Sequence, residues 1–154
     1  MTTTHPAMKC LSALWLAAGL LALFPAVSHA ADLKLEAVLV WGTNDEKPLS
    51  GELKPVTEDI AKKLNCLPFK YTNYFEVNRK QFSVKDAGSE KVRMSKDCVI
   101  TVKNLEGGKV EVTLIGKGQP VGTITQQLKK GKCLVTGGNA ANSTAWFVVL
   151  KQVD

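Results

Sequence analysis

The sequence predicts an α+β fold, an antiparallel sheet of about six to seven strands with one helix packed on it. Two patterns carry this prediction. Residues 98–150 contain short runs rich in β-branched residues, separated by turn-forming segments, which is typical of consecutive antiparallel strands. Residues 55–64 instead repeat an apolar residue at every fourth position, which indicates a single helix with one buried face.

Residues 1–30 are predicted to be a signal peptide. Lys9 precedes an apolar run from Leu11 to Val27, and Ser28-His29-Ala30 places small residues where signal peptidase reads the chain. We therefore expect cleavage after Ala30, export to the periplasm or the cell exterior, and one domain over residues 31–154.

Two points about this leader stay open at the level of sequence. Translation starts at Met1 or at Met8, since Met8 and Lys9 begin a complete signal by themselves. An uncleaved membrane anchor is the alternative to cleavage, but the apolar run is short for a bilayer span and Pro25 interrupts it. After cleavage we expect no transmembrane span.

The first half of the mature domain is predicted to contain a strand, a loop and the helix. Leu33–Trp41 alternates and then becomes wholly apolar, which predicts a strand that runs from an edge into a core. Gly42–Gly51 is rich in charges and turn formers and is predicted to be a surface loop. Pro55–Leu64 is the predicted helix, because proline begins it, acidic residues follow, and lysines stand near its end. The apolar stripe of this helix consists of Val56, Ile60 and Leu64.

An aromatic segment follows the helix. Phe69–Val84 alternates apolar and polar residues, which predicts one long strand, or two strands with a bend near residues 78–80. Core packing is the expected role of its aromatic side chains, and an exposed stripe that binds sugar or peptide is the alternative. The side chains expected on the buried face are Phe69, Tyr71 and Phe75, with Tyr74 on the other face.

Consecutive hairpins are predicted for the second half of the domain. Val110, Val112 and Leu114 alternate with polar residues, so their strand is expected to have one solvated face. Glycine-containing turns separate most of these strands. The predicted strands are residues 98–103, 109–115, 121–128, 133–136 and 145–150.

Gly137 and Gly138, followed by small polar residues, look at first like a phosphate-binding loop. Such a loop needs a lysine after the glycines and a helix behind it, because the helix N-terminus and the lysine hold the phosphate. Neither is present, and an apolar strand pattern follows instead. The glycines are therefore predicted to lie in a loop between antiparallel strands. Asn142-Ser143-Thr144 also matches a glycosylation sequon, a motif short enough to be common by chance.

The absence of histidine limits the chemistry of the mature domain. His5 and His29 both precede the cleavage site. Ser-His-Asp and Cys-His catalysis, a histidine base and histidine metal ligands are therefore excluded for residues 31–154. We expect no catalytic residue, no cofactor and no metal. The alternative is an enzyme that uses carboxylates, whose candidates are Asp45, Glu46 and Glu76.

The charge of the chain favours anionic partners. All of its 20 Lys and Arg residues except Lys9 follow the leader, against 14 Asp and Glu, so the mature chain has a net charge of +5. Most basic residues are scattered and are not interleaved with aromatic residues, so no specific nucleic-acid binding is expected. The candidate anion-binding residues are the cluster Lys129, Lys130 and Lys132.

Three cysteines remain after the leader, and none forms a C-x-x-C pair. An exported protein meets an oxidising compartment, so one disulfide is possible, and Cys66 with Cys98 is the preferred pair because Cys133 lies in a predicted buried strand. Three free, buried thiols are an equally open alternative.

Two resemblances bear on location. The segment "VGTITQQLKKGKCLVTGG" and the apolar strand after it resemble the hairpin pattern of bacterial secretin-type β domains. The chain lacks the membrane-spanning barrel of a secretin, so pore formation is not implied. With "NYFEVNRKQF" and "TAWFVVLK", the chain is also similar to small uncharacterised exported proteins of Gram-negative-type bacteria, which implies a location and no activity.

Together these observations predict a non-catalytic exported envelope protein, a structural module or one that binds another envelope protein or a polymer through sheet edges and loops. The alternative is a basic protein that binds anionic envelope polymers or lipids. The oligomeric state is left open by the sequence.

Overall fold

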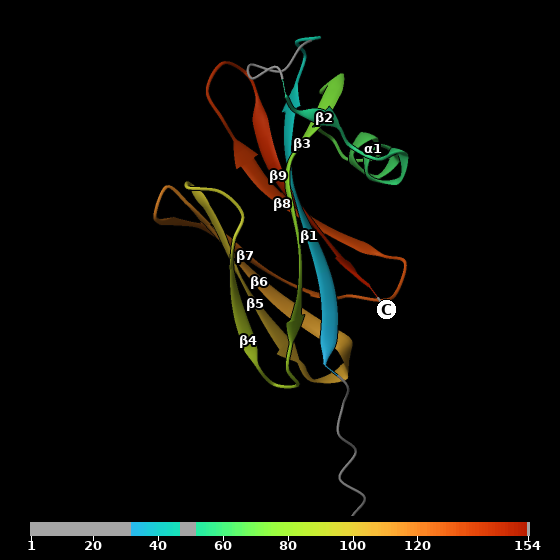
Figure 1. The fold of residues 1–154 in the computed structure, drawn as a ribbon, viewed down its shortest axis with the longest axis vertical. Helices are drawn as coiled ribbons and strands as arrows, with labels where there is room; N and C mark the ends of the chain where they lie inside the picture. Colours follow the sequence, from blue (N-terminus) through green and yellow to red (C-terminus); the bar gives the residue numbers. More distant parts are fainter. Residues whose placement is uncertain (1–31, 47–51, 154) are drawn as a thin grey trace, which may run out of the picture.

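The computed structural model describes residues 32–46 and 52–153, which form two antiparallel sheets and one α-helix (Figure 1). The predicted signal peptide, residues 1–30, and residues 47–51 of the predicted loop lie outside the described residues. A short 3-10 turn, Glu106–Gly108, joins two of the strands. The elements are β1 (Leu33–Thr43), β2 (Lys54–Pro55), α1 (Glu58–Asn65), β3 (Asn73–Val84), β4 (Ser89–Arg93), β5 (Cys98–Leu105), β6 (Lys109–Gly116), β7 (Gln119–Gln127), β8 (Cys133–Asn139) and β9 (Ala145–Gln152).

The described chain is mostly β, and the prediction of one sheet with six to seven strands is wrong. Nine strands form a five-stranded sheet, in the order β2-β3-β1-β9-β8, and a four-stranded sheet, in the order β4-β5-β6-β7. The chain leaves the five-stranded sheet after β3, builds the whole four-stranded sheet, and returns for β8 and β9. Because a hairpin has the same sequence pattern in either sheet, the hairpins alone did not indicate where the chain changes sheets.

The two sheets stack face to face and bury one apolar interior between them. Alternate residues of β1 and β9 meet alternate residues of β5 and β6, as in a β-sandwich. Removing these side chains from water is the main favourable contribution to this packing. The principal interior residues are Leu35, Ala37, Leu39, Val148 and Leu150 of the five-stranded sheet, and Cys98, Ile100, Val102, Val112 and Leu114 of the four-stranded sheet.

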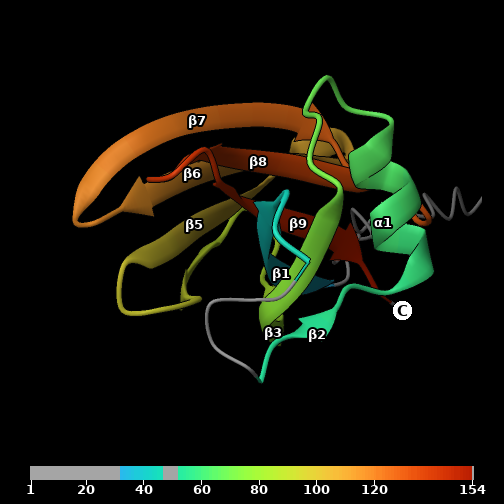
Figure 2. The ribbon, with the colours of Figure 1, turned by 90° about the horizontal axis from the view of Figure 1, so that it is seen from above.

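The other face of the five-stranded sheet is covered by α1. Ile60 and Leu64 of this helix are buried in one cluster with Val38, Val40 and Phe147 of the sheet. Figure 2 shows the resulting three layers, with the five-stranded sheet between the helix and the four-stranded sheet. Since β1 is covered on both faces, its middle is wholly apolar, which explains the loss of alternation in its sequence.

The predicted helix is confirmed, but it spans Glu58–Asn65 and not Pro55–Leu64. Pro55 belongs to β2, where it pairs with Phe75 of β3. Proline is tolerated there because β2 is an edge strand, and its outward side needs no N–H donor. Acidic residues in the first turn and lysines in the last turn complement the helix dipole, as the sequence predicts.

The aromatic segment forms one strand with a bulge. β3 pairs with β1 over its whole length, and the pairing shifts at Val77, next to the predicted bend. Tyr74 and Phe75 are both buried on opposite faces, but the expected burial of Phe69 is wrong, because this residue precedes the strand and its side chain is 43% exposed. Tyr71 is half-buried and packs in the same cluster as Tyr74, so its expected place on the face opposite Tyr74 is also wrong.

Gly137 and Gly138 lie inside β8, so the prediction of a loop at these glycines is wrong. A Cβ atom on Gly137 would lie 2.3 Å from the carbonyl oxygen of Trp146 and 2.9 Å from the ring of Phe147. The glycine is therefore required for the close approach of β8 to β9. The turn between these strands comprises residues 140–144.

We expect Gly137→Ala to destabilise the domain by about 2 kcal/mol, because the added methyl group would collide with the backbone of β9. Thermal or urea unfolding would measure the change. Gly122→Ala in β7 is the matched control, since a Cβ at Gly122 meets nothing within 4 Å. Equal stability of the two variants would contradict the packing argument.

Candidate binding pocket

A cavity of about 530 Å³ opens at one end of the sandwich. It is lined by residues of the β4–β5, β6–β7 and β8–β9 turns together with residues of β1 and β3. The backbone N–H of Lys117 donates a hydrogen bond to the carbonyl oxygen of Asp97 over 2.7 Å, which ties the first two turns together. Loops carried by a rigid scaffold are common positions for binding residues. The end of the sandwich is therefore the candidate site.

Two tryptophans line this cavity. Trp41 of β1 and Trp146 of β9 are directly paired across the two strands, and both are half-buried. The ring of Trp41 also packs on Phe75, with 6.0 Å between ring centroids. The third tryptophan of the sequence is Trp15, in the predicted leader. Both tryptophans of residues 31–154 therefore lie at one site.

Glycines on the neighbouring strands make room for the indole of Trp146. A Cβ atom on Gly116 of β6 would lie 3.2 Å from this ring, and one on Gly138 of β8 would lie 3.5 Å from its Nε1 atom. Larger side chains at these two positions would press on the ring and narrow the cavity. The second glycine of the Gly-Gly pair thus lies beside a ring that lines the pocket.

Two valines extend the apolar lining onto the outer surface. Val77 stands at the bulge of β3 and is 41% exposed, and Val121 near the start of β7 is 46% exposed. Both line the cavity, whose floor contains the buried Leu39 and Cys98. Exposed apolar side chains that adjoin a cavity are typical of a surface that another molecule covers.

The rim of the pocket carries a few polar groups. Asp97 accepts the backbone hydrogen bond from Lys117 and donates its own N–H to Ser95 Oγ over 3.2 Å. Asn139 stands at the end of β8, where the turn to β9 begins. Few polar groups around an apolar floor are the usual composition of a binding pocket, in which the polar groups orient what is bound.

The lysine cluster that the sequence singles out lies away from this pocket. Lys129, Lys130 and Lys132 occupy the turn between β7 and β8, at the ends of these strands opposite to the pocket, and all three are exposed. The N–H of Lys132 donates to the carbonyl oxygen of Lys129 over 2.9 Å, and Gly131 adopts a φ of +75° in the same turn. The three lysines are therefore close together, on a separate surface.

The disulfide between Cys66 and Cys98, one of two alternatives left open by the sequence, is absent from the structure, in which Cys66, Cys98 and Cys133 are free. Cys66 is exposed at the end of α1, whereas Cys98 is buried between the two sheets. The five-stranded sheet thus separates the two thiols, which the spacing along the sequence did not indicate. Burial raises the pKa of Cys98 to about 11, so its thiol is a poor nucleophile at neutral pH.

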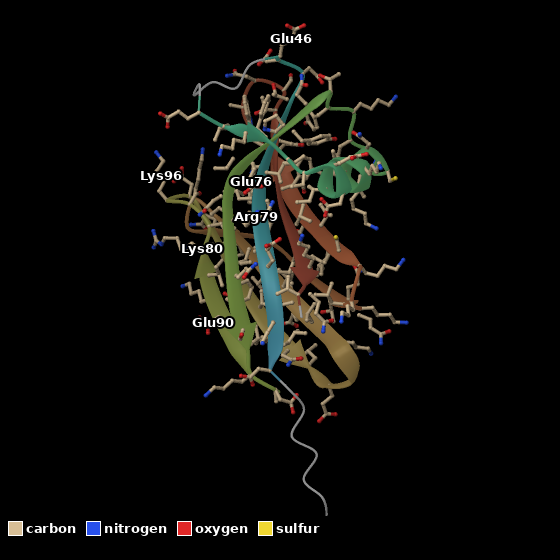
Figure 3. All side chains as sticks on the ribbon, turned by 45° about the vertical axis from the view of Figure 1, so that its right-hand side comes forward. Glu46, Glu76, Arg79, Lys80, Glu90 and Lys96 are labelled. Carbon is tan, nitrogen blue, oxygen red and sulfur yellow. The ribbon has the colours of Figure 1, made fainter. Side chains whose placement is uncertain are left out.

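The three carboxylates considered for an enzyme are not brought together. Asp45 is held in a local turn, where its N–H donates to Thr43 Oγ1 over 3.1 Å. Figure 3 shows Glu46 at the tip of the molecule, whereas Glu76 lies lower, close to Arg79. Glu76 instead accepts two hydrogen bonds from Arg79, at 3.0 Å and 2.6 Å. These residues do not form an acid–base pair.

A charged network covers the part of the five-stranded sheet that α1 leaves open. Arg79 of β3 bridges Glu76 and the buried Glu36 of β1, with a distance of 2.6 Å to each carboxylate. Glu36 also accepts from Gln81 and from Lys151 of β9, each at 3.0 Å. Burial tends to raise the pKa of Glu36, but these hydrogen bonds and positive charges outweigh it and lower that pKa. The network joins three strands and is structural.

The residues that define the pocket were not predicted as a site. Trp41, Val77, Val121 and Trp146 come from four strands in two sheets. The sequence offered one signal of this site. Only two tryptophans follow the predicted leader, and both lie in segments predicted as strands.

The fold and the pocket define a helix-covered antiparallel β-sandwich with an apolar site at one end. No family model matches the chain, and no curated protein or solved structure is significantly similar to it. Within residues 32–46 and 52–153, no group of His, Cys, Asp and Glu side chains is arranged to hold a metal ion. Nor does this part of the chain contain a helix long and apolar enough to cross a membrane.

Proposed function

We propose that this chain is an exported, non-catalytic binding module whose end pocket receives an apolar side chain of a partner protein. The observation that carries the proposal is the gathering of Trp41, Trp146, Val77 and Val121 at one cavity. Aromatic and aliphatic side chains around a pocket supply most of the binding energy in many protein interfaces.

A protein partner is favoured over a small enclosed ligand by the exposure of the lining. Pockets for small ligands bury most of the ligand surface. Here Val77 and Val121 are 41% and 46% exposed and continue the apolar lining outward. A partner that inserts one apolar side chain and packs around it would cover these valines as well.

The proposal that the protein is non-catalytic is supported by the side chains available for acid–base chemistry. Residues 31–154 contain no histidine, and the carboxylates of Asp45 and Glu76 are engaged by Thr43 and Arg79. Export is inferred from the predicted signal peptide that ends at Ala30. The proposal therefore places the binding partner in the envelope or outside the cell.

The experiment is affinity capture from the envelope fraction, followed by a titration with the partner that is identified by mass. Binding should change the tryptophan emission, because both tryptophans of residues 31–154 line the pocket. We expect Val121→Asp to weaken binding at least tenfold, since a carboxylate would be desolvated in the covered interface. The exposure of Val121 predicts that this variant folds normally.

A variant with Lys129, Lys130 and Lys132 replaced by alanine is the control, because these residues lie at the opposite end of the strands. It should bind the partner as the wild type does. Retained binding by Val121→Asp, or binding without a change in tryptophan emission, would rule out the pocket. If only the lysine variant loses binding, and wild-type binding falls steeply with salt, the alternative of a basic binder of anionic polymers or lipids applies.

A further inference from the structure

The β7 strand is a sheet edge that is unprotected over most of its length. It pairs only with β6, and all nine of its residues, Gln119–Gln127, are exposed, including Ile124 at 37%. None of these residues is charged. An exposed edge strand presents unpaired backbone N–H and C=O groups, and natural proteins commonly protect such edges with charges, proline or short length.

The other three edges of the described sheets are protected. β4, at the far edge of the four-stranded sheet, has charged side chains at three of its five positions. β2 is two residues long and ends in Pro55. β8 has buried or half-buried residues except for Asn139. The contrast makes the exposure of β7 a specific feature of this strand.

Protection on β7 is confined to its first residues. Pro120 has no N–H to donate, and the pairing with β6 shifts at Val121. The six residues after this shift, Gly122–Gln127, pair regularly with β6 and include the β-branched Thr123, Ile124 and Thr125. This segment has the composition and the regular extended form that a further strand needs.

We propose that Gly122–Gln127 pairs with the same segment of a second copy of this chain. The two β7 strands lie antiparallel about a two-fold axis and join the two four-stranded sheets into one continuous sheet. The contact uses backbone hydrogen bonds on the open side of β7. None of these six residues lines the pocket, so the proposal is independent of the function proposed above.

The second copy is favoured as the occupant by the charge of the segment. Two-fold pairing places residues of β7 opposite residues of the same strand in the second copy, so that a charge at the axis would face its own copy and any other charge in this short segment would lie near its own copy. Like charges opposite each other destabilise a strand pair. The sequence of Gly122–Gln127 contains none, although the mature domain as a whole has a net charge of +5. An uncharged segment is what self-pairing requires.

The test is sedimentation of the protein, expressed from the full-length chain and purified as the host processes it, over micromolar to millimolar concentrations. We expect a monomer–dimer equilibrium. Thr125→Lys should weaken the dimer at least tenfold, because it brings two positive charges into one short paired segment, close to the two-fold axis. The fold should tolerate this change, since Thr125 is opposite Glu111 of β6. Gln119→Lys adds the same charge before Pro120 and should leave the dimer unchanged.

Hydrogen exchange gives a second measurement that does not depend on a variant. The amides of Gly122–Gln127 should become more protected in concentrated than in dilute wild-type protein, while the amides of β4 should not change. A wild-type protein that stays monomeric at every concentration would overturn the proposal. So would a dimer that Thr125→Lys leaves intact, or a strand of another protein bound at β7 while the protein alone is monomeric.

Discussion

Phe147→Ala is expected to destabilise the domain by about 3–5 kcal/mol, the usual cost of deleting a buried phenylalanine. Phe147 of β9 is 2% exposed and belongs to the cluster between the five-stranded sheet and α1. Its ring contacts those of Phe69, Tyr71 and Tyr74, with centroid distances of 5.1 Å, 6.2 Å and 6.1 Å. Removal of the ring leaves a cavity and ends three aromatic contacts at once. Urea or thermal unfolding measures the loss.

Phe69→Ala is the matched control for this prediction. Phe69 contacts the same ring but is 43% exposed, so its removal takes away one aromatic contact and leaves little buried space. We expect a cost of about 1 kcal/mol. If the two variants were equally stable, the aromatic cluster would not depend on Phe147.

Arg79→Met should lower the free energy of unfolding by about 2 kcal/mol or more, because it removes the cation that joins two carboxylates. Urea or thermal unfolding measures the change. Glu36, whose side chain is 7% exposed, would keep only Lys151 and Gln81 as partners, and Glu76 would lose both of its hydrogen bonds from Arg79. A buried charge that loses a partner is costly, although the partial exposure of Arg79 moderates the effect. Methionine retains most of the aliphatic stem, so lost packing contributes little.

Lys62→Met is the matched control, because Lys62 pairs with Glu58 on the exposed side of α1, where both side chains are more than two-thirds exposed. Its cost should be about 0.5 kcal/mol or less. If Lys62→Met and Arg79→Met lowered the free energy of unfolding equally, the burial of Glu36 would not contribute to the effect of Arg79.

The pH dependence of stability provides an additional readout of this network. The pKa of Glu36 in the folded state lies below its ordinary value of 4.5, so the ionised carboxylate stabilises the fold above this pH. This contribution is lost as the pH falls through the folded-state pKa. Unfolding measured between neutral and acidic pH should therefore show a smaller acid-induced loss in Glu36→Gln than in the wild type. If acid destabilised Glu36→Gln as much as the wild type, the lowered pKa of Glu36 in the folded state would be contradicted.

Much of the local structure was predictable because it depends on near neighbours. The helix was predictable from the four-residue repeat of Val56, Ile60 and Leu64. The acidic residues near its start and the lysines near its end, which complement the helix dipole, supported the same prediction. β5 and β6 were predictable from alternation, since each has one face in the core and one in solvent. The predicted element boundaries were less accurate where a residue's conformation depends on a partner far away in the sequence. Pro55, for example, pairs with Phe75 in β3 and does not begin the helix.

The candidate site was not predictable in the same way. The lysine cluster was visible because its members are adjacent in sequence, whereas Trp41, Val77, Val121 and Trp146 are widely separated and each fits a core strand. The Gly-Gly pair was visible too, but its meaning depends on Trp146 and Phe147 in the neighbouring strand. A glycine that permits a close approach has the same local signature as one that permits a turn.

The sequence by itself determined the helix and most of the strands, because helical and strand periodicities are properties of consecutive residues. The short strands β2 and β4 were not predicted. Tertiary structure alone decided that the strands divide into two sheets, that Cys66 and Cys98 lie on different sides of the five-stranded sheet, and that two tryptophans meet at one end. These outcomes depend on which apolar faces pack together. Several pairings bury similar apolar area, and the choice among them is made by the fit of the whole set of side chains.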